Sequence, residues 1–354
     1  FIVFLILFHF GIQVILAHNV GSFYKATCNW DCYWYMDIAR NGYDLMPRLH
    51  DSLRLAQANW AFFPLYPGLV RIFSSLSGLD VFSTAMMINT LLWLFMIYLA
   101  YVELGQRGIR PDKLTFAILF VFFPFSIWFS IPYTETLYGT LLLASIITVR
   151  RQWFIATSLM CFLMCLTRPP GFVVTAILAI YALYNGLHQA DCQRKKIAAF
   201  INAIMIMIVG GAGLSAYALY LNYHVGDGFA FSHVQVAWMR SMGFFLTNII
   251  QSLFHHHERI SGIYALFAML FIFFQYRARW YLSAVILSVT FLVACSTGPA
   301  SIERYIMANP LMISFFVNGI CNLPVRYRYA SALLCVVVNI IFIIAWSYGK
   351  RFLV

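Results

Sequence analysis

Long apolar segments follow one another along nearly the whole chain, and this pattern constrains the fold more than any other feature. Hydrophobic residues make up 62% of the 354 residues and charged residues only 10%, whereas roughly a quarter of an ordinary soluble domain is charged. Most segments approach the ~20 residues that cross a bilayer as a helix. A helix satisfies its own backbone hydrogen bonds in lipid, so the sequence predicts an all-α, polytopic membrane helical bundle.

The segments predict about eleven transmembrane helices in one domain that covers residues 1–354. Residues 1–17 resemble the apolar part of a signal peptide, but no small-residue cleavage site follows them, so we expect a retained first helix. Residues 61–78 contain two prolines, an arginine and three serines, which indicates a half-inserted or interfacial helix. The spans are expected near residues 1–18, 80–104, 114–131, 136–149, 153–167, 171–187, 197–221, 261–276, 280–295, 308–321 and 330–348.

The distribution of basic residues predicts the orientation in the membrane. With the N-terminus inside, the inner loops hold 12 of the 23 Lys and Arg residues but 3 of the 12 acids, as the positive-inside rule requires. The positive-inside arrangement of the loops therefore accounts for the net charge of +11. Because this charge needs no acidic partner to explain it, we expect no nucleic-acid partner. The outer side holds two long loops, residues 19–60 and 222–260, and most of the acids. We expect the working surface there, because loops carry most functional groups.

The first outer loop contains the main candidate for chemistry, Asp31. Trp30, Trp34 and Ile38 recur at helical spacing, which predicts an interfacial helix with one apolar face. Trp and Tyr are enriched at the membrane–water boundary, so this helix is expected to lie flat there. A carboxylate beside aromatic side chains suits a general base. The alternative is a solvated aspartate or one that caps the helix.

The eight cysteines are scattered and give no disulfide framework. Cys161, Cys165, Cys295 and Cys335 fall within predicted spans. Cys28 and Cys32 flank Asp31, where both a disulfide and two free thiols are compatible with the spacing. We expect free thiols.

Several short motifs occur in order from the first outer loop to about residue 310. They are Trp30-Asp31, Trp34-Tyr35, Ile38-Ala39 and Gly42-Tyr43, then Phe62-Phe63-Pro64-Leu65-Tyr66-Pro67, Pro132-Tyr133-Thr134-Glu135-Thr136-Leu137, Thr167-Arg168-Pro169 and Ile302-Glu303-Arg304-Tyr305. Together they resemble the PIG-V mannosyltransferase family, which includes GPI mannosyltransferase 2 and shorter bacterial relatives. The chain departs from that pattern at Asp37, where relatives often carry a basic residue, and at Glu303, where a proline is common.

The resemblance implies a GT-C fold and transfer of a sugar from a polyprenyl- or dolichyl-phosphate donor, usually with inversion. It assigns the catalytic role to Asp31. The leaving lipid phosphate needs fixed cations, and arginine pairs with phosphate in a bidentate manner. The alternative for each arginine is snorkelling or pairing with a nearby acid. The outer-side candidates for the donor phosphate are Arg304, Arg168, Arg240, Arg259 and His257, with His255 and His256 adjacent.

A second group of residues is expected to bind the sugar or the acceptor. For Glu135 the alternative is a helix cap beside Pro132 and Thr134. Three successive histidines lack the i, i+4 spacing of a helical metal site, so we expect no metal ion and no cofactor. The group consists of Glu135, Trp30, Trp34, Tyr35, Asp37 and Tyr133.

The sequence therefore predicts a glycosyltransferase, in particular a mannosyltransferase, that uses a lipid-phosphate sugar within membrane lipids. The sequence does not distinguish between a glycolipid, a glycan and a protein as the acceptor. The expected location is a bacterial inner membrane with a periplasmic active site, and the alternative is the ER membrane with a lumenal site. The competing class is a transporter or flippase of lipid-linked sugars, which predicts internal repeats and ionisable groups deep within spans. A non-catalytic scaffold is a third alternative. The absence of a sequence repeat favours the enzyme.

Overall fold

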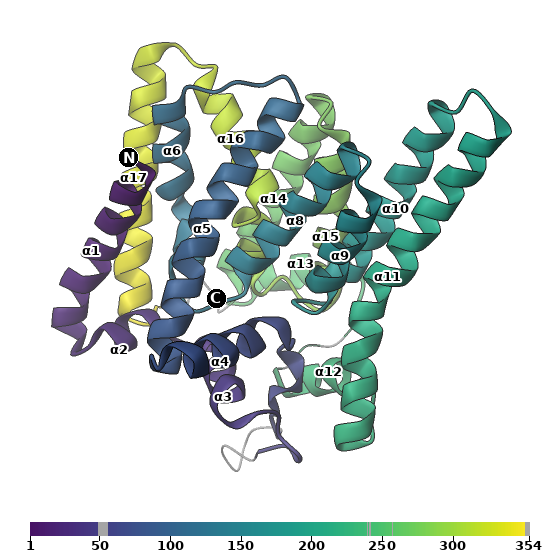
Figure 1. Ribbon diagram of the computed structural model, residues 1–354. Coiled ribbons are helices and arrows are strands. Elements are labelled where there is room, and N and C mark those ends of the chain that lie inside the picture. The colour runs from purple at the N-terminus through teal and green to yellow at the C-terminus, as the bar shows by residue number, and fades with distance from the viewer. Residues whose placement is uncertain (49–55, 239, 241, 257, 351–354) are drawn as a thin grey trace.

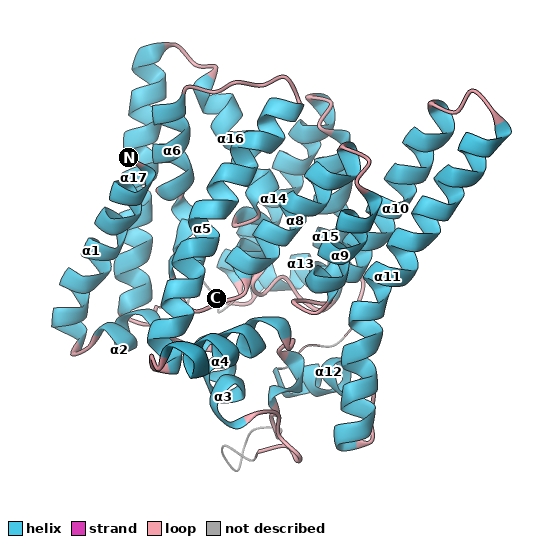
Figure 2. Ribbon diagram, viewed as in Figure 1, coloured by secondary structure: helices cyan, strands magenta, loops and turns pink. Residues whose placement is uncertain are grey.

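A computed structural model describes residues 1–48, 56–238, 240, 242–256 and 258–350. Within these ranges the regular structure is helical, apart from one isolated bridge between Arg48 and Gln57 (Figure 2). The all-α class predicted from the apolar pattern is confirmed.

The helices pack around one large apolar core that draws residues from Leu5 to Trp346. Three short elements, η1 to η3, are 3₁₀-helices and η4 is a π-helical turn. In chain order the elements are α1 (Ile2–Val20), α2 (Phe23–Thr27), α3 (Asp31–Asn41), η1 (Asn59–Ala61), α4 (Leu65–Ser77), α5 (Val81–Gln106), α6 (Lys113–Val121), η2 (Pro124–Ser126), α7 (Ile127–Ser130), α8 (Glu135–Arg150), α9 (Phe154–Cys165), α10 (Pro170–His188), α11 (Gln193–Val225), α12 (Ala230–His233), η3 (Val234–Trp238), α13 (Phe245–Phe254), α14 (Arg259–Arg277), α15 (Tyr281–Ser296), η4 (Glu303–Met307), α16 (Pro310–Cys321) and α17 (Val325–Ser347).

Each of the eleven predicted spans coincides with helical structure. Among the described residues, six helices are long and apolar enough to cross a membrane, namely α1, α5, α10, α11, α14 and α17, and a bent pair adds a seventh. The helices α9, α15 and α16 have 10–17 residues, and α8 has 16. Length and composition alone thus support fewer full spans than the eleven expected. The region 61–78 contains α4, a helix of 13 residues, where an interfacial helix was predicted.

The segment predicted as one span over residues 114–131 is broken. Here α6 ends at Val121, and the chain continues through η2 and α7 at an angle of 60°. Pro124 explains the break, because its ring excludes a continuous helix and it has no N–H to donate. Asn339 of α17 supports the freed backbone by donating to the carbonyl oxygens of Phe123 (2.9 Å) and Pro124 (3.4 Å). Such internal hydrogen bonds allow non-helical backbone within a membrane protein.

The basic inner loops gather at one end of the bundle. Figure 1 shows the α5–α6, α10–α11 and α16–α17 turns at the top, whereas α2, α3, α4 and α12 lie at the bottom. At the upper end Glu103 accepts hydrogen bonds from Arg107 (2.6 Å) and Arg150 (2.9 Å), and Gln152 donates to Gln189 (2.9 Å). By the positive-inside rule, this end is the one expected to face the cytoplasm. The first outer loop therefore lies at the opposite end.

The long helix α11 supports that loop. Its 33 residues extend about 50 Å, which exceeds the ~30 Å hydrocarbon core of a bilayer. At its lower end the Tyr217 hydroxyl donates to the carbonyl oxygen of Trp60 (2.7 Å), and a ring nitrogen of His224 lies 3.2 Å from the carbonyl oxygen of Tyr43. This part of α11 thus anchors the polar segment that connects α3 to α4.

Cys192 and Tyr223 lie at opposite ends of α11, so labelling at these two positions tests the orientation of the protein in the membrane. Both are exposed, Tyr223 by 92%. We expect a membrane-impermeant maleimide to label Cys192 only from the cytoplasmic side and the variant Tyr223→Cys from the other side. The measurement compares sealed right-side-out vesicles with permeabilised ones, and Cys192→Ser provides the background for the second site. Labelling of both positions from the same face would contradict the assigned orientation.

Candidate functional site

Asp31 begins α3 at the outer end of the bundle. The predicted helix is confirmed, since α3 runs from Asp31 to Asn41. The preceding residue, Trp30, has a φ of +47°, a conformation that side-chain-bearing residues rarely adopt. This sharp turn directs the chain into α3 and leaves the carboxylate at the positive end of the helix dipole, which favours a negative charge.

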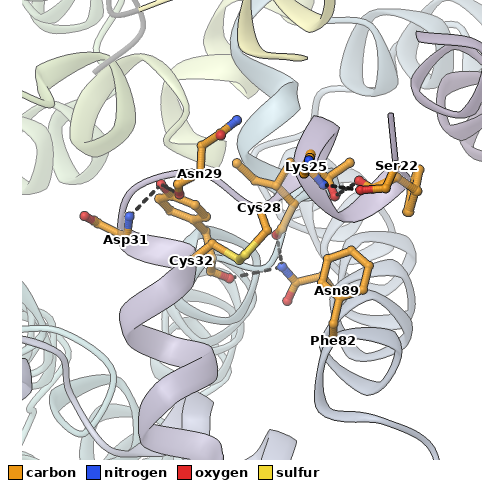
Figure 3. Close-up of a disulfide and its surroundings, with 12 residues drawn as sticks. Ser22, Lys25, Cys28, Asn29, Asp31, Cys32, Phe82 and Asn89 are labelled. Atoms are coloured by element: carbon orange, nitrogen blue, oxygen red, sulfur yellow. Dashed lines mark hydrogen bonds between the residues drawn. A yellow bond between two sulfur atoms is a disulfide. The ribbon is translucent and has the colours of Figure 1, made fainter. Parts of the chain in front are cut away.

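A disulfide joins Cys28 and Cys32 across this turn (Figure 3). The expectation of free thiols is therefore wrong. The Cα atoms lie 5.2 Å apart, within the range that a disulfide spans. The extended backbone at Cys28 and the turn at Trp30 bring the two side chains together, a geometry that sequence spacing does not reveal. The other six cysteines are free.

Tyr133 connects this turn to the segment before α8. Its hydroxyl donates to the carbonyl oxygen of Asn29 (2.8 Å) and accepts from the backbone N–H of Asp31 (3.1 Å, a dashed line in Figure 3). Asn89 of α5 in turn donates to the carbonyl oxygens of Ile131 and Tyr133. The backbone that leads into α8 is thereby held against the backbone that leads into α3.

Four charged side chains from distant parts of the sequence form one continuous chain of ion pairs. Arg304 Nη1 donates to Asp31 Oδ2 (2.6 Å), and Arg304 Nε donates to Glu135 Oε1 (2.7 Å). Arg168 Nη2 donates to the same oxygen of Glu135 (2.6 Å). Glu135, Arg168 and Arg304 are buried, whereas the Asp31 side chain is 28% exposed. Asp31 therefore forms the accessible end of a buried charge array.

Aromatic rings enclose both guanidinium groups. Arg304 lies over the rings of Tyr133 (4.6 Å) and Trp128 (5.1 Å), and Arg168 lies over Tyr305 (5.0 Å). Such cation–π contacts stabilise desolvated arginines. Burial opposes the charge on each guanidinium, but the nearby carboxylates outweigh burial, so the pKa of Arg168 lies above its ordinary value and that of Arg304 lies well above it. Both arginines are therefore permanent cations.

The π-helical turn η4 supplies Arg304 and Tyr305. Arg240 Nη2 donates to Ser301 Oγ (3.3 Å), so the second outer loop contacts the segment that leads into η4. Burial raises the pKa of the Tyr305 hydroxyl, but Arg240, Arg168 and Arg304 together bring that pKa below its ordinary value. Three of the arginines predicted to bind phosphate thus surround one tyrosine.

The predicted aromatic residues of α3 form a wall next to Asp31. Trp34 stacks on Phe62 with centroids 5.7 Å apart and meets the edge of Trp238 at 5.9 Å. The Tyr35 hydroxyl lies 3.3 Å from Thr134 Oγ1. Burial raises the pKa of Tyr35 well above its ordinary value. These rings bring together α3, the Phe62 motif and the second outer loop.

Two other candidates on the first outer loop point elsewhere. Trp30 packs edge-on against Trp346 of α17 (4.8 Å). Asp37 is paired with Arg48 (2.7 Å) and accepts from Asn41 (2.7 Å). Neither residue joins the chain of ion pairs.

The predicted basic residues near the start of α14 also lie outside the array. Arg259 is exposed and donates to the carbonyl oxygen of Leu253 (3.1 Å). His255 contacts the carbonyl oxygen of Gln251 (2.8 Å), His256 is exposed, and His257 lies outside the described residues. In the described part of the chain, no group of three or more His, Cys, Asp or Glu side chains has the geometry of a metal site.

Sequence reasoning missed several residues of the site. Trp128 contacts Arg304, and Tyr138 and Asn309 line a small cavity beside Glu135, Arg168 and Arg304. This cavity has a volume of about 10 Å³, room for roughly one water molecule. The sequence signal that could have identified these residues is their position next to the motifs. Trp128 precedes the Pro132 motif, and Asn309 follows the Arg304 motif.

No model of a known protein family matches the chain, and no curated protein matches it. Membership in the PIG-V family is thus not confirmed. Among solved structures, ArnT from Cupriavidus metallidurans bound to undecaprenyl phosphate is similar, with a TM-score of 0.56 and 13% identity over 94% of this chain. The chain spans 62% of the length of ArnT. A second solved structure is the archaeal oligosaccharyltransferase AglB from Archaeoglobus fulgidus in complex with an inhibitory peptide and a dolichol-phosphate. It has a TM-score of 0.45 and 12% sequence identity, and the match covers 97% of this chain and 56% of AglB. The similarity to ArnT shows that the two chains share a fold over most of this chain.

Removing the Cys28–Cys32 disulfide should lower stability. A bridge that closes a loop of this size contributes about 2 kcal/mol through chain entropy. We therefore expect the double variant Cys28→Ser/Cys32→Ser to lose roughly that free energy of unfolding, measured by denaturant titration in mixed micelles. The control is Cys192→Ser, which removes an exposed free thiol. Alkylation of Cys28 and Cys32 without prior reduction would contradict the bridge.

Arg304 should be the most sensitive position of the array. Arg304→Ala leaves Asp31 without its ion-pair partner and Glu135 with Arg168 alone. Breaking a buried ion pair costs about 3–5 kcal/mol, and we expect a loss of unfolding free energy in that range. The matched control Arg259→Ala removes an exposed arginine and should stay within about 0.5 kcal/mol of the unaltered protein. Equal effects of the two substitutions would show that the array is not a stabilising unit.

Proposed function

We propose that this protein is an integral-membrane glycosyltransferase that transfers a sugar from a polyprenyl-phosphate donor at the non-cytoplasmic face. The observation that carries the proposal is the chain of ion pairs from partly exposed Asp31 through Arg304 and Glu135 to Arg168. A base and fixed cations at one membrane edge are what such a transfer requires. Asp31 begins α3, which lies at the end of the bundle opposite the basic loops (Figure 1).

Asp31 is the proposed general base. Its Oδ2 accepts from Arg304, whereas no described residue donates to Oδ1. The acceptor hydroxyl attacks the anomeric carbon, a new C–O bond forms, and the hydroxyl proton passes to the Asp31 carboxylate. The bond between the anomeric carbon and the phosphate oxygen breaks, and the electron pair leaves with the lipid phosphate. A single displacement of this kind inverts the anomeric centre.

Arg168, Arg304 and Arg240 are the proposed phosphate ligands. Charge accumulates on the leaving phosphate as the bond breaks, and preorganised guanidinium groups stabilise it. The fold similarity to ArnT, whose structure contains undecaprenyl phosphate, supports a polyprenyl-phosphate partner. The small cavity beside these arginines has room for only about one water molecule, so donor binding requires neighbouring side chains to move apart. We propose no metal ion or cofactor as part of the reaction.

Mannose is the proposed sugar, on the basis of the PIG-V resemblance. Trp34 and Tyr35 lie on the proposed sugar and acceptor side, because aromatic rings stack on apolar sugar faces. Tyr133 supports this side from below, since its hydroxyl is already bonded to Asn29 and Asp31. The acceptor is a hydroxyl of a glycolipid, a glycan or a protein. We place the enzyme in a bacterial inner membrane with a periplasmic active site, where an oxidising compartment is compatible with the Cys28–Cys32 bridge.

Substitution of Asp31 tests this mechanism. Without the base, Asp31→Asn should reduce transfer about 10²- to 10⁴-fold. The measurement uses proteoliposomes with radiolabelled polyprenyl-phosphate-mannose and candidate acceptors, and it follows the formation of polyprenyl phosphate. The matched control is Asp227→Asn, which alters an exposed outer-loop carboxylate paired with His233 and should leave turnover unchanged.

Two outcomes would contradict the proposal. Near-normal turnover of folded Asp31→Asn would remove Asp31 from the mechanism. Movement of the donor across the membrane without formation of a glycosidic bond would identify a transporter or flippase instead.

A further inference from the structure

The mechanism above leaves one buried acid unused. Glu303 begins η4, directly before Arg304, and its side chain is fully buried. Neither of its carboxyl oxygens has a hydrogen-bond partner among the described residues. The family pattern that the sequence resembles commonly has a proline here, so the resemblance assigns no role to this carboxyl.

Physical chemistry indicates the protonation state of Glu303. A buried carboxylate without hydrogen bonds is far more costly than the neutral acid. The titratable and charged groups that act on it are Arg304, Arg240, Glu135 and, on α14, Tyr264. Burial raises the pKa of Glu303 to about 8, although Arg304 and Arg240 act in the opposite direction. Glu303 therefore carries a proton at neutral pH and loses it as the pH rises through about 8.

This proton determines the net charge of the array. Arg168 and Arg304 are paired with Asp31 and Glu135, and Arg240 acts on Glu303 as a third cation nearby, so a neutral Glu303 leaves one positive charge in excess. Ionisation of Glu303 cancels that excess. The new carboxylate also attracts the Arg240 guanidinium, whose one side-chain hydrogen bond among the described residues is the long one to Ser301 Oγ (3.3 Å).

We propose that Glu303 is a positioning residue that, as a neutral acid, keeps the Arg240 and Arg304 guanidinium groups available for a singly charged phosphodiester. This proposal rests on the proposed function, because it concerns the donor phosphate of the same site. A sugar–phosphate–lipid donor carries one negative charge and matches the single positive charge in excess. When Glu303 is ionised, the site has no net charge and binds the phosphodiester more weakly.

The predicted pH dependence has a definite sign. The protonated form predominates below about pH 8 and is the form that binds. Binding is therefore full at pH 7 and is lost as the pH rises through the pKa of about 8. If only the protonated form binds, the dissociation constant rises about tenfold between pH 7 and pH 9. A phosphodiester has no proton of its own to lose in this range, so the change reports the protein.

The test uses Glu303→Gln, which has the shape of the neutral acid and cannot ionise. The probe is a polyprenyl methyl phosphodiester, which contains no sugar, and its affinity for the full-length protein in nanodiscs is measured at pH 7 and pH 9. We expect unaltered protein to bind about tenfold more weakly at pH 9. We expect Glu303→Gln to bind with similar affinity at both pH values, equal to that of the unaltered protein at pH 7. The control Glu258→Gln, at an exposed position, should retain the full pH dependence.

A second measurement does not depend on ligand binding. Infrared difference spectra of unaltered protein between pH 7 and pH 9 should show the loss of a protonated-carboxyl C=O band, and Glu303→Gln should lack this change. The absence of the band in unaltered protein would overturn the proposal even if a variant misfolds. A pH dependence that persists in Glu303→Gln would also overturn it. If neither protein binds the probe at either pH, the proposed lipid-phosphate donor itself fails, which is a distinguishable result and also removes the proposal.

Discussion

The pairing of Arg304 with two carboxylates is the interaction on which the rest of the site depends. A guanidinium buried at a membrane edge needs opposite charge nearby, and Asp31 and Glu135 supply it from two other parts of the chain. Arg168 completes the charge balance through the same oxygen of Glu135. One arginine thus fixes the relative positions of the first outer loop, the start of α8 and the turn η4. Any chemistry at Asp31 depends on this arrangement.

The array also requires irregular backbone close to the hydrocarbon region. The bend after α6, the segment before α8 and the π-helical turn η4 all interrupt regular helices. Asparagine side chains stabilise two of these interruptions, because Asn339 and Asn89 donate to carbonyl oxygens that a continuous helix would have satisfied. Charged groups therefore reach the outer edge of the bundle without exposing unsatisfied backbone to lipid.

Asp31 is held from three directions while one of its oxygens stays open. The disulfide between Cys28 and Cys32 closes the turn before α3, Tyr133 accepts from its backbone N–H, and Arg304 binds Oδ2. A catalytic group needs a fixed orientation and an accessible atom, and this combination provides both. The proton on Glu303 sets the net charge of the same array, although Glu303 does not contact the reacting atoms.

The sequence alone determined the helical class and the approximate positions of the helices, and it indicated Asp31, Glu135, Arg168 and Arg304 as candidates. The orientation stays a prediction from the distribution of charge. Hydropathy and charge are local properties, and lipid leaves the backbone few alternatives to helix. Only the tertiary structure decided which candidates meet, because contact depends on how distant segments pack. It brought Arg240 to Ser301, next to η4, and left Arg259 exposed. It also paired Cys28 with Cys32 and buried Glu303 without a hydrogen-bond partner among the described residues. Spacing along the chain contains none of these distances.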